Sequence, residues 1–517
     1  MNVSMQSAEL ILLHPEDNVA VAAKAIAAGT RLQVAGREFT AQEAIKQGHK
    51  VALAPLKTDT VVLKYGQPIG FTTQAVAQGA WVHSHNLQQR LVQREYEKST
   101  AIPPPPEPIL GRTFQGYRRA DGKAGTRNYV GIISNVNCSA TVARYIADRF
   151  NHDLLKAYPN IDGVVAFRHG TGCGMQFGGL KHEMLNRTMA GIARHPNIGA
   201  YLMVGLGCEQ GSLGYLMESQ RLYQIQGVGQ PAKLPPVLSM QDCGGTAKTV
   251  EAGIKALAQL LPQANDVRRE AIPVSEIILG TNCGGSDGNS GVTCNPALGI
   301  ASDMLVAAGG TSVLAETTEV YGAEQLLTRR ATTPAVADKL LERIQWWLWH
   351  AGVYGVELDC NPSVGNKEGG LTTIAEKSLG AVAKAGSTAM TEVYQYAEPI
   401  HAKGFVLMDT PGFDPPSVTG LVAGGCNMIV FTTGRGSCFG CKPVPSIKVA
   451  SNTPMYERMI DDMDLNAGEI LNGQPVATVG REIFEEIIAV ASGKRTKSEL
   501  LGYGDDEFVP WTVGPTL

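Results

Sequence analysis

Apolar residues in the first 87 positions of the chain occur in short groups that are separated by glycine. The groups at 18–21, 50–53 and 60–63 are each four residues long, and glycines punctuate the segment at positions 29, 36, 48, 66 and 79. Strands of this length and spacing are typical of a compact β module and not of a helical bundle. We also expect one short helix near residues 41–47.

A proline-rich segment at residues 101–108 marks the end of this pattern. It reads AIPPPPEP, and the residues directly before it, 88–100, are polar and charged. Such a run favours the extended polyproline II conformation and acts as a semi-rigid spacer. The sequence therefore predicts an N-terminal module over residues 1–87 and a linker over residues 88–110.

Longer apolar runs alternate with helical patterns in the rest of the chain. Residues 129–136 form a continuous apolar run, and 139–155 show helical spacing. A long helix is predicted over 334–350, with Thr333 as its N-cap and Pro334 at its first position. Further strands are predicted at 163–167, 201–206, 236–240, 277–279, 312–315, 405–408 and 428–431.

This alternation predicts α/β layers built mainly on parallel sheets. A polar stretch at 262–272 divides the region, so we expect one α/β domain at residues 111–268 and a second at 269–517.

Composition narrows the class of protein. The chain has 44 Lys and Arg against 48 Asp and Glu, a net charge of −4, which argues against a nucleic-acid partner. No apolar run approaches the roughly 20 residues that a membrane-spanning helix needs. The first residues lack the features of a secretory signal, so we expect a cytoplasmic protein whose ten cysteines are thiols. Glycine is abundant, at 59 of 517 residues.

Five cysteines share one kind of position, because each lies in a turn just beyond a predicted strand: Cys138, Cys173, Cys208, Cys243 and Cys283. In open α/β sheets ligands bind outside the carboxyl ends of the strands, so several of these thiols could converge on one crevice. A thiolate can bind iron or zinc, or act as a nucleophile. A free cysteine is also commonly a small buried apolar residue, and both interpretations stay open here.

Two histidines, His83 and His85, lie two residues apart in the sequence WVHSHN. On a strand, this spacing places both side chains on the same face. Such a pair can supply two nitrogen ligands to Fe(II), Zn(II) or Mn(II). The alternative is two surface histidines at the end of the module.

Three polar, glycine-rich loops follow, at residues 283–291, 361–370 and 432–436. The backbone N–H groups of the loop at 283–291 could approach a ligand closely, and this loop does not have the sequence of a nucleotide-binding loop. Two of the three loops carry a cation suited to a carboxylate, Lys367 and Arg435. The alternative is a set of tight turns with solvated charges.

These motifs together resemble the altronate/galactarate dehydratase family of sugar-acid dehydratases. The resemblance rests on residues 18–20, 48–50, 65–70 and 83–86 in the module, and on 169–173, 205–209, 283–287, 295–296, 361–370 and 433–436 in the body. It implies an N-terminal β-clip module of the SAF type followed by two α/β domains. It also implies dehydration of a hexonate or hexarate to a 2-keto-3-deoxy acid with Fe(II), or with Mn(II) or another divalent metal.

The resemblance suggests a role for each candidate residue. A divalent metal would polarise the substrate carboxylate while a base removes the C2 proton and the C3 hydroxyl leaves. The expected metal ligands are His83 and His85, with Cys138, Cys173, Cys208 and Cys283 at the metal or the pocket. The expected substrate-binding residues are Arg435, Ser286, Asp287 and Asn366. The expected catalytic residues are His169, then His49, and Lys367, which would also hold the carboxylate.

Alternatives of other kinds stay open. The segment SCFGC at residues 437–441 departs from what the resemblance leads us to expect, so a relative with another leaving group, such as a sulfolactate sulfo-lyase, is a candidate. The strand-end cysteines would also suit an iron–sulfur or redox enzyme, and a non-catalytic sugar-acid-binding protein is a third reading. The linker would let the module reach a second copy of the chain, which favours a homodimer.

Overall fold

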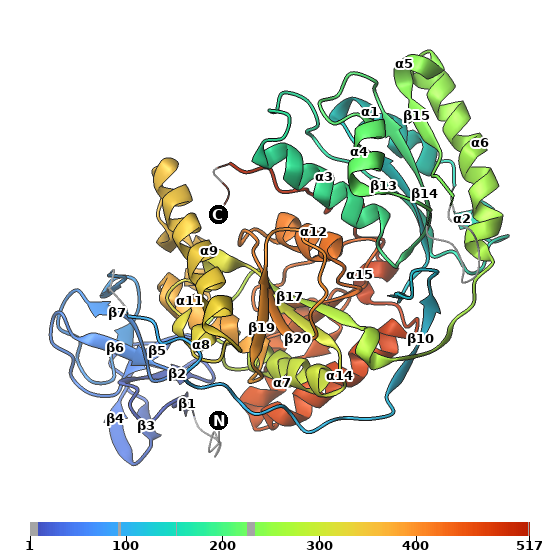
Figure 1. The fold of residues 1–517 in the computed structure, drawn as a ribbon. Helices are drawn as coiled ribbons and strands as arrows, with labels where there is room; N and C mark the ends of the chain where they lie inside the picture. Colours follow the sequence, from blue (N-terminus) through green and yellow to red (C-terminus); the bar gives the residue numbers. More distant parts are fainter. Residues whose placement is uncertain (1–8, 91–94, 151, 225–232, 515, 517) are drawn as a thin grey trace.

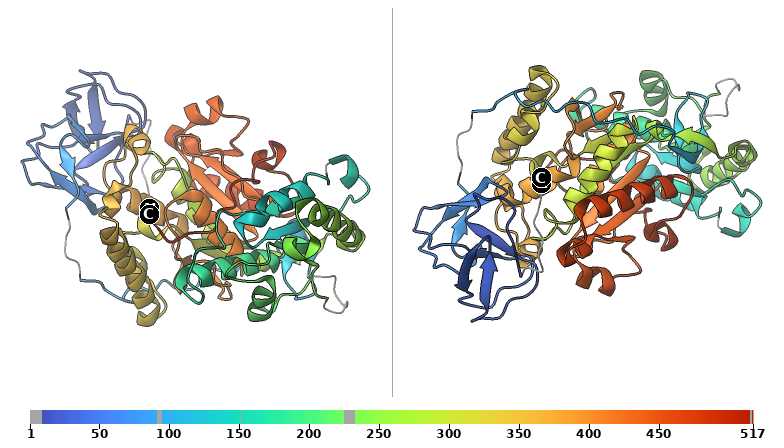
Figure 2. Two further views of the ribbon diagram at one scale, coloured as in Figure 1. Left: turned by 90° about the horizontal axis from the view of Figure 1, so that it is seen from above. Right: turned by 90° about the horizontal axis from the view of Figure 1, so that it is seen from below.

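The computed structural model describes residues 9–90, 95–150, 152–224, 233–514 and 516. Figure 1 shows three parts: an all-β module at the N-terminus, a middle α/β domain and a C-terminal α/β domain. The views from above and below in Figure 2 place the C-terminal domain between the other two. The fold is therefore the predicted β module followed by two α/β domains.

The N-terminal module consists of short antiparallel strands. One sheet has the order β1-β2-β5-β8, a second is the β3-β4 hairpin, and a third has the order β6-β7-β9. The strands are β1 (Leu10–Ile11), β2 (Val19–Ala22), β3 (Arg31–Val34), β4 (Arg37–Thr40), β5 (Lys50–Ala52), β6 (Val61–Lys64), β7 (Gln67–Thr72), β8 (Trp81–Val82) and β9 (Leu87–Gln88).

The short helix predicted near residues 41–47 is wrong. Ala41 and Ile45 are buried at helical spacing, but Ile45 forms an isolated antiparallel bridge with Ile26. The backbone N–H of Ala41 donates to Thr30 O at 2.9 Å, and Gly48 N donates to Ala22 O at 2.8 Å. Cross-strand contacts thus produce the same burial pattern that a helix would.

The middle domain is a parallel sheet with helices on both faces (Figure 1). Its strand order is β13-β12-β14-β15. The strands are β12 (Tyr129–Ser134), β13 (Gly163–Phe167), β14 (Ile198–Gly205) and β15 (Val237–Ser239), and the helices are α1 (Asn137–Ala147), α2 (His152–Leu155), α3 (Leu180–Ala193), α4 (Leu213–Gln220), α5 (Met240–Cys243) and α6 (Thr246–Asn265). The helix predicted from 139 to 155 is wrong in extent, because α1 ends at Ala147.

The C-terminal domain has a seven-stranded parallel sheet in the order β19-β20-β18-β17-β21-β22-β23. The strands are β17 (Ile278–Cys283), β18 (Thr311–Leu314), β19 (Met390–Tyr394), β20 (Gly404–Met408), β21 (Met428–Thr433), β22 (Ser446–Ala450) and β23 (Leu465–Asn466). Its helices are α7 (Cys294–Ala307), α8 (Gln325–Thr328), α9 (Pro334–Val353), α10 (Val364–Glu368), α11 (Ile374–Ala381), α12 (Asp414–Gly424), α13 (Thr453–Arg458), α14 (Val476–Ala491) and α15 (Lys497–Leu500).

The start of helix α9 confirms the signals in the sequence. The Thr333 hydroxyl accepts a hydrogen bond from Val336 N at 3.4 Å, and Pro334 is the first helical residue, where its missing N–H costs nothing. The helix continues to Val353, three residues beyond the predicted end.

The proline-rich segment follows the surface of the C-terminal domain. Ala101 N donates to Arg329 O at 2.8 Å, and Ile109 N donates to Ala307 O at 2.9 Å. The chain then enters a small sheet of order β11-β10-β16, made of β10 (Thr113–Arg118), β11 (Ala124–Gly125) and β16 (Glu270–Pro273). The spacer is thus anchored at both ends.

Shared hydrophobic cores join the three parts. One core combines Val62 and Ile69 of the module with Leu314 and Phe405 of the C-terminal domain. Another combines Ile133 and Met189 of the middle domain with apolar residues of strands β18, β20 and β21. Burial of continuous apolar surface fixes both junctions, since it is the main favourable term in association.

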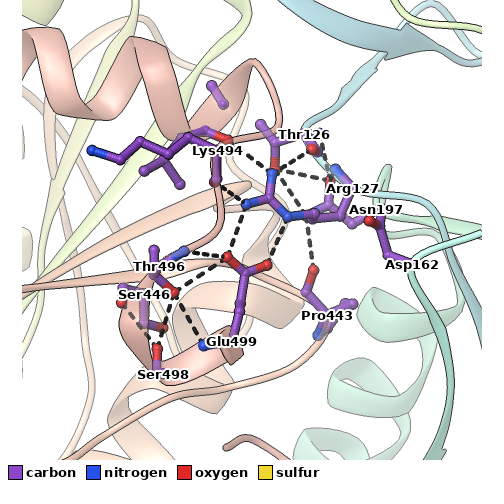
Figure 3. Close-up of polar contacts among 12 residues, drawn as sticks. Thr126, Arg127, Asp162, Asn197, Pro443, Ser446, Lys494, Thr496, Ser498 and Glu499 are labelled. Atoms are coloured by element: carbon purple, nitrogen blue, oxygen red, sulfur yellow. Dashed lines mark hydrogen bonds and ion pairs between the residues drawn. The ribbon is translucent and has the colours of Figure 1, made fainter. Parts of the chain in front are cut away.

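A buried arginine also joins the two α/β domains through an ion pair and hydrogen bonds (Figure 3). The Arg127 guanidinium makes a two-pronged contact with Glu499, with Nε–Oε1 at 2.6 Å and Nη2–Oε2 at 2.9 Å. It also donates to the carbonyl oxygens of Val490 and Lys494, both at 2.8 Å. A buried arginine is tolerated when its donors are satisfied in this way.

Candidate active site

The tip of the β6–β7 hairpin brings a tyrosine from the module to the C-terminal domain. Tyr65 and Gly66 form a two-residue turn with φ of 61° and 69°, as a type I′ hairpin requires. The Asp17 carboxylate accepts from Tyr65 N at 3.1 Å and from Gly66 N at 2.8 Å. The Tyr65 hydroxyl reaches Gly291, where an added Cβ would lie 2.4 Å from it.

Tyr65 forms one wall of a pocket at the carboxyl end of β17. This strand is the switch point of the seven-stranded sheet, with β18 on one side and β21 on the other, and ligands of open α/β sheets bind at such points. The pocket is lined by Tyr65, Cys283, Ser286, Asp287, Ser290, Gly291, Asn295, Leu371, Glu376, Lys377 and Gly380. Module and C-terminal domain therefore build it together.

Behind the pocket lies a buried cluster of one thiol, two carboxylates and two lysines. The ligand atoms of Cys283, Glu316 and Glu319 all lie within 4.8 Å of one another. Lys384 Nζ donates to Cys283 Sγ at 2.9 Å and also pairs with Glu316. Lys377 Nζ pairs with Glu319, and the Cys283 thiol donates to Glu319 Oε2 at 3.6 Å. Each carboxylate thus has its own ammonium group.

Burial controls the protonation of this cluster. It raises the pKa of the Cys283 thiol well above its ordinary value, and the nearby Glu316 carboxylate adds to that shift. Burial also raises the pKa of Glu316, while Lys384 opposes this change. Glu316 Oε1 has no hydrogen-bond partner among the described residues. The backbone of Glu316 is left-handed, with φ of 65°, and such strained residues concentrate at functional sites.

A second buried ionic group docks the module at the pocket. Lys50 Nζ donates to both oxygens of Glu376, at 2.9 and 2.8 Å, and Lys64 Nζ donates to Glu376 Oε1 at 2.8 Å. Burial alone would raise the pKa of Glu376, but the two lysines hold it below its ordinary value. Burial lowers the pKa of Lys50 to about 8. All three side chains are fully buried between the two parts of the chain.

Three predicted substrate ligands lie in the loop after β17 or against it. Asp287 and Ser286 line the pocket, and Ser286 Oγ has no hydrogen-bond partner within the described part of the chain. The Asp287 carboxylate accepts from Ser290 and Ser451, each at 2.8 Å, so it braces the loop. Asn366 Nδ2 donates to Ser286 O at 2.8 Å and holds the same loop from outside.

The two predicted cations lie outside the pocket lining. Arg435 is half exposed and is 3.4 Å from the Glu368 carboxylate, which is also exposed. Lys367 is on the short helix α10. Both flank the loops around Gly369, where an added Cβ would lie 2.9 Å from Asp287 Cβ.

The histidine pair is in a turn, so the expected strand is wrong. Strand β8 ends at Val82, and Asn86 N donates to His83 O at 2.9 Å. Turn formation outweighs strand pairing here because Asn86 Oδ1 also accepts from His83 N at 2.9 Å. His85 is exposed, whereas His83 Nδ1 is buried without a partner among the described atoms. Burial and the nearby Lys50 lower the pKa of His83 to about 3.

His49 is near His83, with ring centroids 5.1 Å apart. Its Nδ1 accepts from Trp81 Nε1 at 3.0 Å, so its Nε2 carries the proton and donates to Glu368 O at 3.1 Å. Burial lowers the pKa of His49 to about 4. Both ring nitrogens are therefore engaged: Nδ1 within the module, and Nε2 in docking the module on the loop that ends at Gly370.

The remaining predicted residues belong to the middle domain. His169 follows β13, and its Nδ1 accepts from Thr171 N at 3.2 Å. Burial lowers the pKa of His169 to about 4. Cys138, Cys173 and Cys208 are exposed at the ends of the neighbouring strands. The structure thus brings Cys283, Ser286 and Asp287 together at one pocket and leaves this second group at another sheet.

Glu316, Glu319, Lys377 and Lys384 were missed by sequence reasoning. The two glutamates directly follow the predicted strand at 312–315, so their position beyond a strand end was a usable signal. The lysines gave no such signal, because a lysine on a helix is ordinarily a solvated side chain.

Within the described ranges, no helix combines the length and apolar composition needed to cross a membrane.

Three family descriptions match the chain in order. They are the altronate/galactarate dehydratase SAF domain over residues 8–90, the D-galactarate dehydratase/altronate hydrolase second domain over 116–265, and the D-galactarate/altronate dehydratase C-terminal domain over 274–516.

Individual relatives align over nearly the whole chain. Altronate dehydratase of Bacillus subtilis (strain 168) is 37% identical over 491 residues, 95% of this chain and 96% of that protein. Galactarate dehydratase (L-threo-forming) of Escherichia coli (strain K12) is 38% identical over 497 residues, 94% of this chain and 93% of that protein. The (2R)-sulfolactate sulfo-lyase subunit beta of Chromohalobacter salexigens is 29% identical over 400 residues, 76% of this chain and 96% of that subunit.

Proposed function

This chain belongs to the altronate/galactarate dehydratase family and is a sugar-acid dehydratase, a hydro-lyase; we propose that it converts a hexonate or hexarate, such as altronate or galactarate, to its 2-keto-3-deoxy acid in the pocket at β17. The observation that supports this proposal is that residues of both the module and the C-terminal domain line the pocket. Tyr65 of the module lines it together with Cys283, Ser286 and Lys377 of the C-terminal domain.

Lys377 is proposed to bind the substrate carboxylate. Its Nζ donates to Glu319 and, at 2.9 Å, to Asn361 Oδ1, which leaves one of its three N–H donors for a ligand. Although burial opposes the charge, Glu319 raises the pKa of Lys377 above its ordinary value. The ammonium charge therefore persists and can stabilise the negative charge that develops when the C2 proton leaves.

Ser286 and Tyr65 are proposed to hold the substrate hydroxyls. Ser286 Oγ is buried and has no partner among the described residues, so it is available to a ligand. Tyr65 lines the same pocket, and its hydroxyl lies against Gly291. Together with Lys377 they would fix a polyhydroxy acid at one end and along one side.

Glu316 is proposed to meet the bound ligand through its free carboxylate oxygen. Burial raises its pKa, so the proton that it carries must leave before this oxygen can bind a metal ion. Its Oε1 is the carboxylate oxygen that is unpaired within the described chain. Glu319 contacts both Lys377 and Cys283, so it connects the cation of the pocket with the thiol.

Cys283, Glu316 and Glu319 are proposed to hold the Fe(II), with Mn(II) as the alternative. A thiolate and carboxylates suit these metals, and the unpaired Glu316 Oε1 offers a free donor. Two carboxylates and two ammonium groups leave no net charge, so the thiol would lose its proton when the ion binds. When bound, the metal would act as a Lewis acid on the substrate oxygens.

The cytoplasmic location and the homodimer stay predictions.

A substrate screen tests the proposal. Anaerobic protein with Fe(II) should convert altronate, galactarate or a stereoisomer to a 2-keto-3-deoxy acid, detected by mass spectrometry. The (2R)-sulfolactate control should yield no sulfite. The Lys377→Met variant should bind and turn over the preferred acid far less well, while Lys367→Met, a cation outside the pocket lining, should retain activity. Full activity in Lys377→Met would refute the placement of the site.

A further inference from the structure

The carboxyl edge of the middle sheet carries three exposed thiols. Cys173 follows β13, Cys138 follows β12 and Cys208 follows β14, and the order β13-β12-β14 makes these strands neighbours. The cysteines of the C-terminal core are buried instead, as at Cys283 and Cys426. Exposed free thiols are prone to oxidation, so three of them on one edge are better explained by a shared ligand than by packing.

Backbone hydrogen bonds hold the first two thiol loops together. Asn137 N donates to Thr171 O at 2.8 Å, which ties the loop of Cys138 to the loop of Cys173. Gly172 has φ of 103°, and a Cβ there would lie 2.6 Å from Asn135 O. Only glycine allows such a close approach with this backbone, so the two loops cannot part without losing the contact.

The third loop is tied to the same place. Gln210 N donates to Gly172 O at 3.2 Å. The Glu209 carboxylate accepts from Asn135 Nδ2 at 3.2 Å and from Gly207 N at 2.7 Å. Cys208 is therefore held on a rigid loop beside Cys138 and Cys173, which is how proteins preorganise metal ligands.

The spacing of the thiols points to the kind of ligand. The hydrogen bonds from Asn137 N to Thr171 O and from Gln210 N to Gly172 O keep the three thiols on adjoining loops. Among the described residues, however, the set of ligand atoms all within 4.8 Å of one another is Cys283, Glu316 and Glu319. One tetrahedral zinc ion with Zn–S bonds of about 2.3 Å needs sulfurs about 3.8 Å apart. The cysteines of a four-iron cluster bind different irons and stand farther apart.

We propose that Cys138, Cys173 and Cys208 bind a [4Fe–4S] cluster at this edge, separate from the pocket at β17. Three irons take the three thiolates, and the fourth is open to an oxygen ligand such as water or a small carboxylate. Cys138 is in the first turn of α1, where backbone N–H groups without a partner inside the helix can donate to a bound group. Cys243, beyond the outer strand β15, lies outside the ligand set.

Reconstitution with iron and sulfide under anaerobic conditions tests the proposal. The wild-type chain should hold four acid-labile sulfides and show visible charge-transfer absorption. Cys138→Ser, Cys173→Ser and Cys208→Ser should each lose most of both signals while keeping the circular dichroism spectrum. Cys243→Ser, a thiol at the next strand end, and Cys360→Ser, an exposed thiol of the C-terminal domain, should keep both signals.

Alkylation of the native protein gives a second measurement that needs no variant. In reconstituted protein these three cysteines should resist iodoacetamide, and Cys360 should react; removal of the cluster should expose all of them. A wild-type chain without sulfide, a bound zinc ion in place of sulfide, or protection of other cysteines would overturn the proposal. Lys377→Met should retain full sulfide while losing dehydration, so failure here and failure of the proposed pocket can be told apart.

Discussion

The protein contains two parallel sheets that differ in which residues lie at their carboxyl edges and in whether those residues are buried. At the seven-stranded sheet the N-terminal module covers the edge, and buried charges meet in pairs, Glu316 with Lys384 and Glu319 with Lys377. At the four-stranded sheet exposed residues follow the strands and leave the edge open, and three of them are the thiols Cys138, Cys173 and Cys208. Excluding water strengthens charge interactions, so the covered edge suits the handling of a small anion. The open edge, with its exposed thiols, suits the binding of a metal that prefers sulfur ligands.

The largest effect is expected where the module is fastened to the covered edge. Glu376→Gln would leave Lys50 and Lys64 buried without their carboxylate. Removing one partner of a buried ion pair costs about 3–5 kcal/mol, so we expect a lower melting temperature and loss of activity together. Thermal unfolding and limited proteolysis should show the module released from the rest of the chain.

Glu368→Gln is the matched control, because Glu368 is an exposed carboxylate 3.4 Å from Arg435 in the same region. Exposed pairs contribute at most about 1 kcal/mol, so this variant should melt close to the wild type. If Glu376→Gln melted as high as Glu368→Gln, the covered edge would not depend on the ionic docking.

The next effect concerns the charge inside the pocket. Lys377→Met should lower kcat/KM about 100- to 1000-fold, as expected for losing a donor that stabilises developing charge. Lys377→Arg should recover part of the loss, since it restores the charge without the same geometry. Steady-state kinetics on the preferred acid measure this. Equal activity in the methionine and arginine variants would show that charge at Lys377 is not used.

Metal affinity should depend on pH at the covered edge. Burial and Glu316 raise the pKa of Cys283 well above its ordinary value, so metal binding must displace a proton at neutral pH. Below that pKa, the Kd of Mn(II) should fall at least tenfold for each unit that the pH rises, and more steeply below pH 7, because burial also raises the pKa of Glu316 to about 7. Electron paramagnetic resonance can follow free Mn(II) between pH 6 and 8. Cys283→Ser should bind weakly and with a shallower slope, and a pH-independent wild type would contradict the assignment.

Much of the fold could be predicted because buried parallel strands are continuous apolar runs. The runs at 129–136, 163–167 and 428–431 correspond to β12, β13 and β21. Cys138 lies just beyond β12 as expected, whereas Cys283 is the last residue of β17 and not part of the turn after it. The turn at His83–Asn86 could not be predicted from spacing alone, since side-chain and backbone hydrogen bonds of Asn86 decide it.

The partners within the site could not be predicted for a different reason. Lys377 and Lys384 are on segments that read as ordinary helix, and they are buried only because tertiary packing places them against Glu319 and Glu316. Lys50 is part of the 48–50 motif, and nothing in the local sequence indicates that it is fully buried against Glu376. Pairings between residues that are far apart in the chain carry no local pattern.

The smallest effect is expected at the hairpin tip, and it measures what the module contributes beyond docking. Tyr65→Phe removes one hydroxyl from the pocket wall but keeps the ring and the two-residue turn. One hydrogen bond to a neutral ligand is worth about 0.5–1.5 kcal/mol, so kcat/KM should fall roughly 2- to 13-fold with an unchanged melting temperature. Asp17 fastens the turn, and Lys64, which interacts with the hydroxyl, stays paired with Glu376, so the variant should change contact with the substrate more than closure of the edge. Unchanged kinetics would mean that the module acts only as a cover, and the contrast between the two edges would then rest on exclusion of water alone.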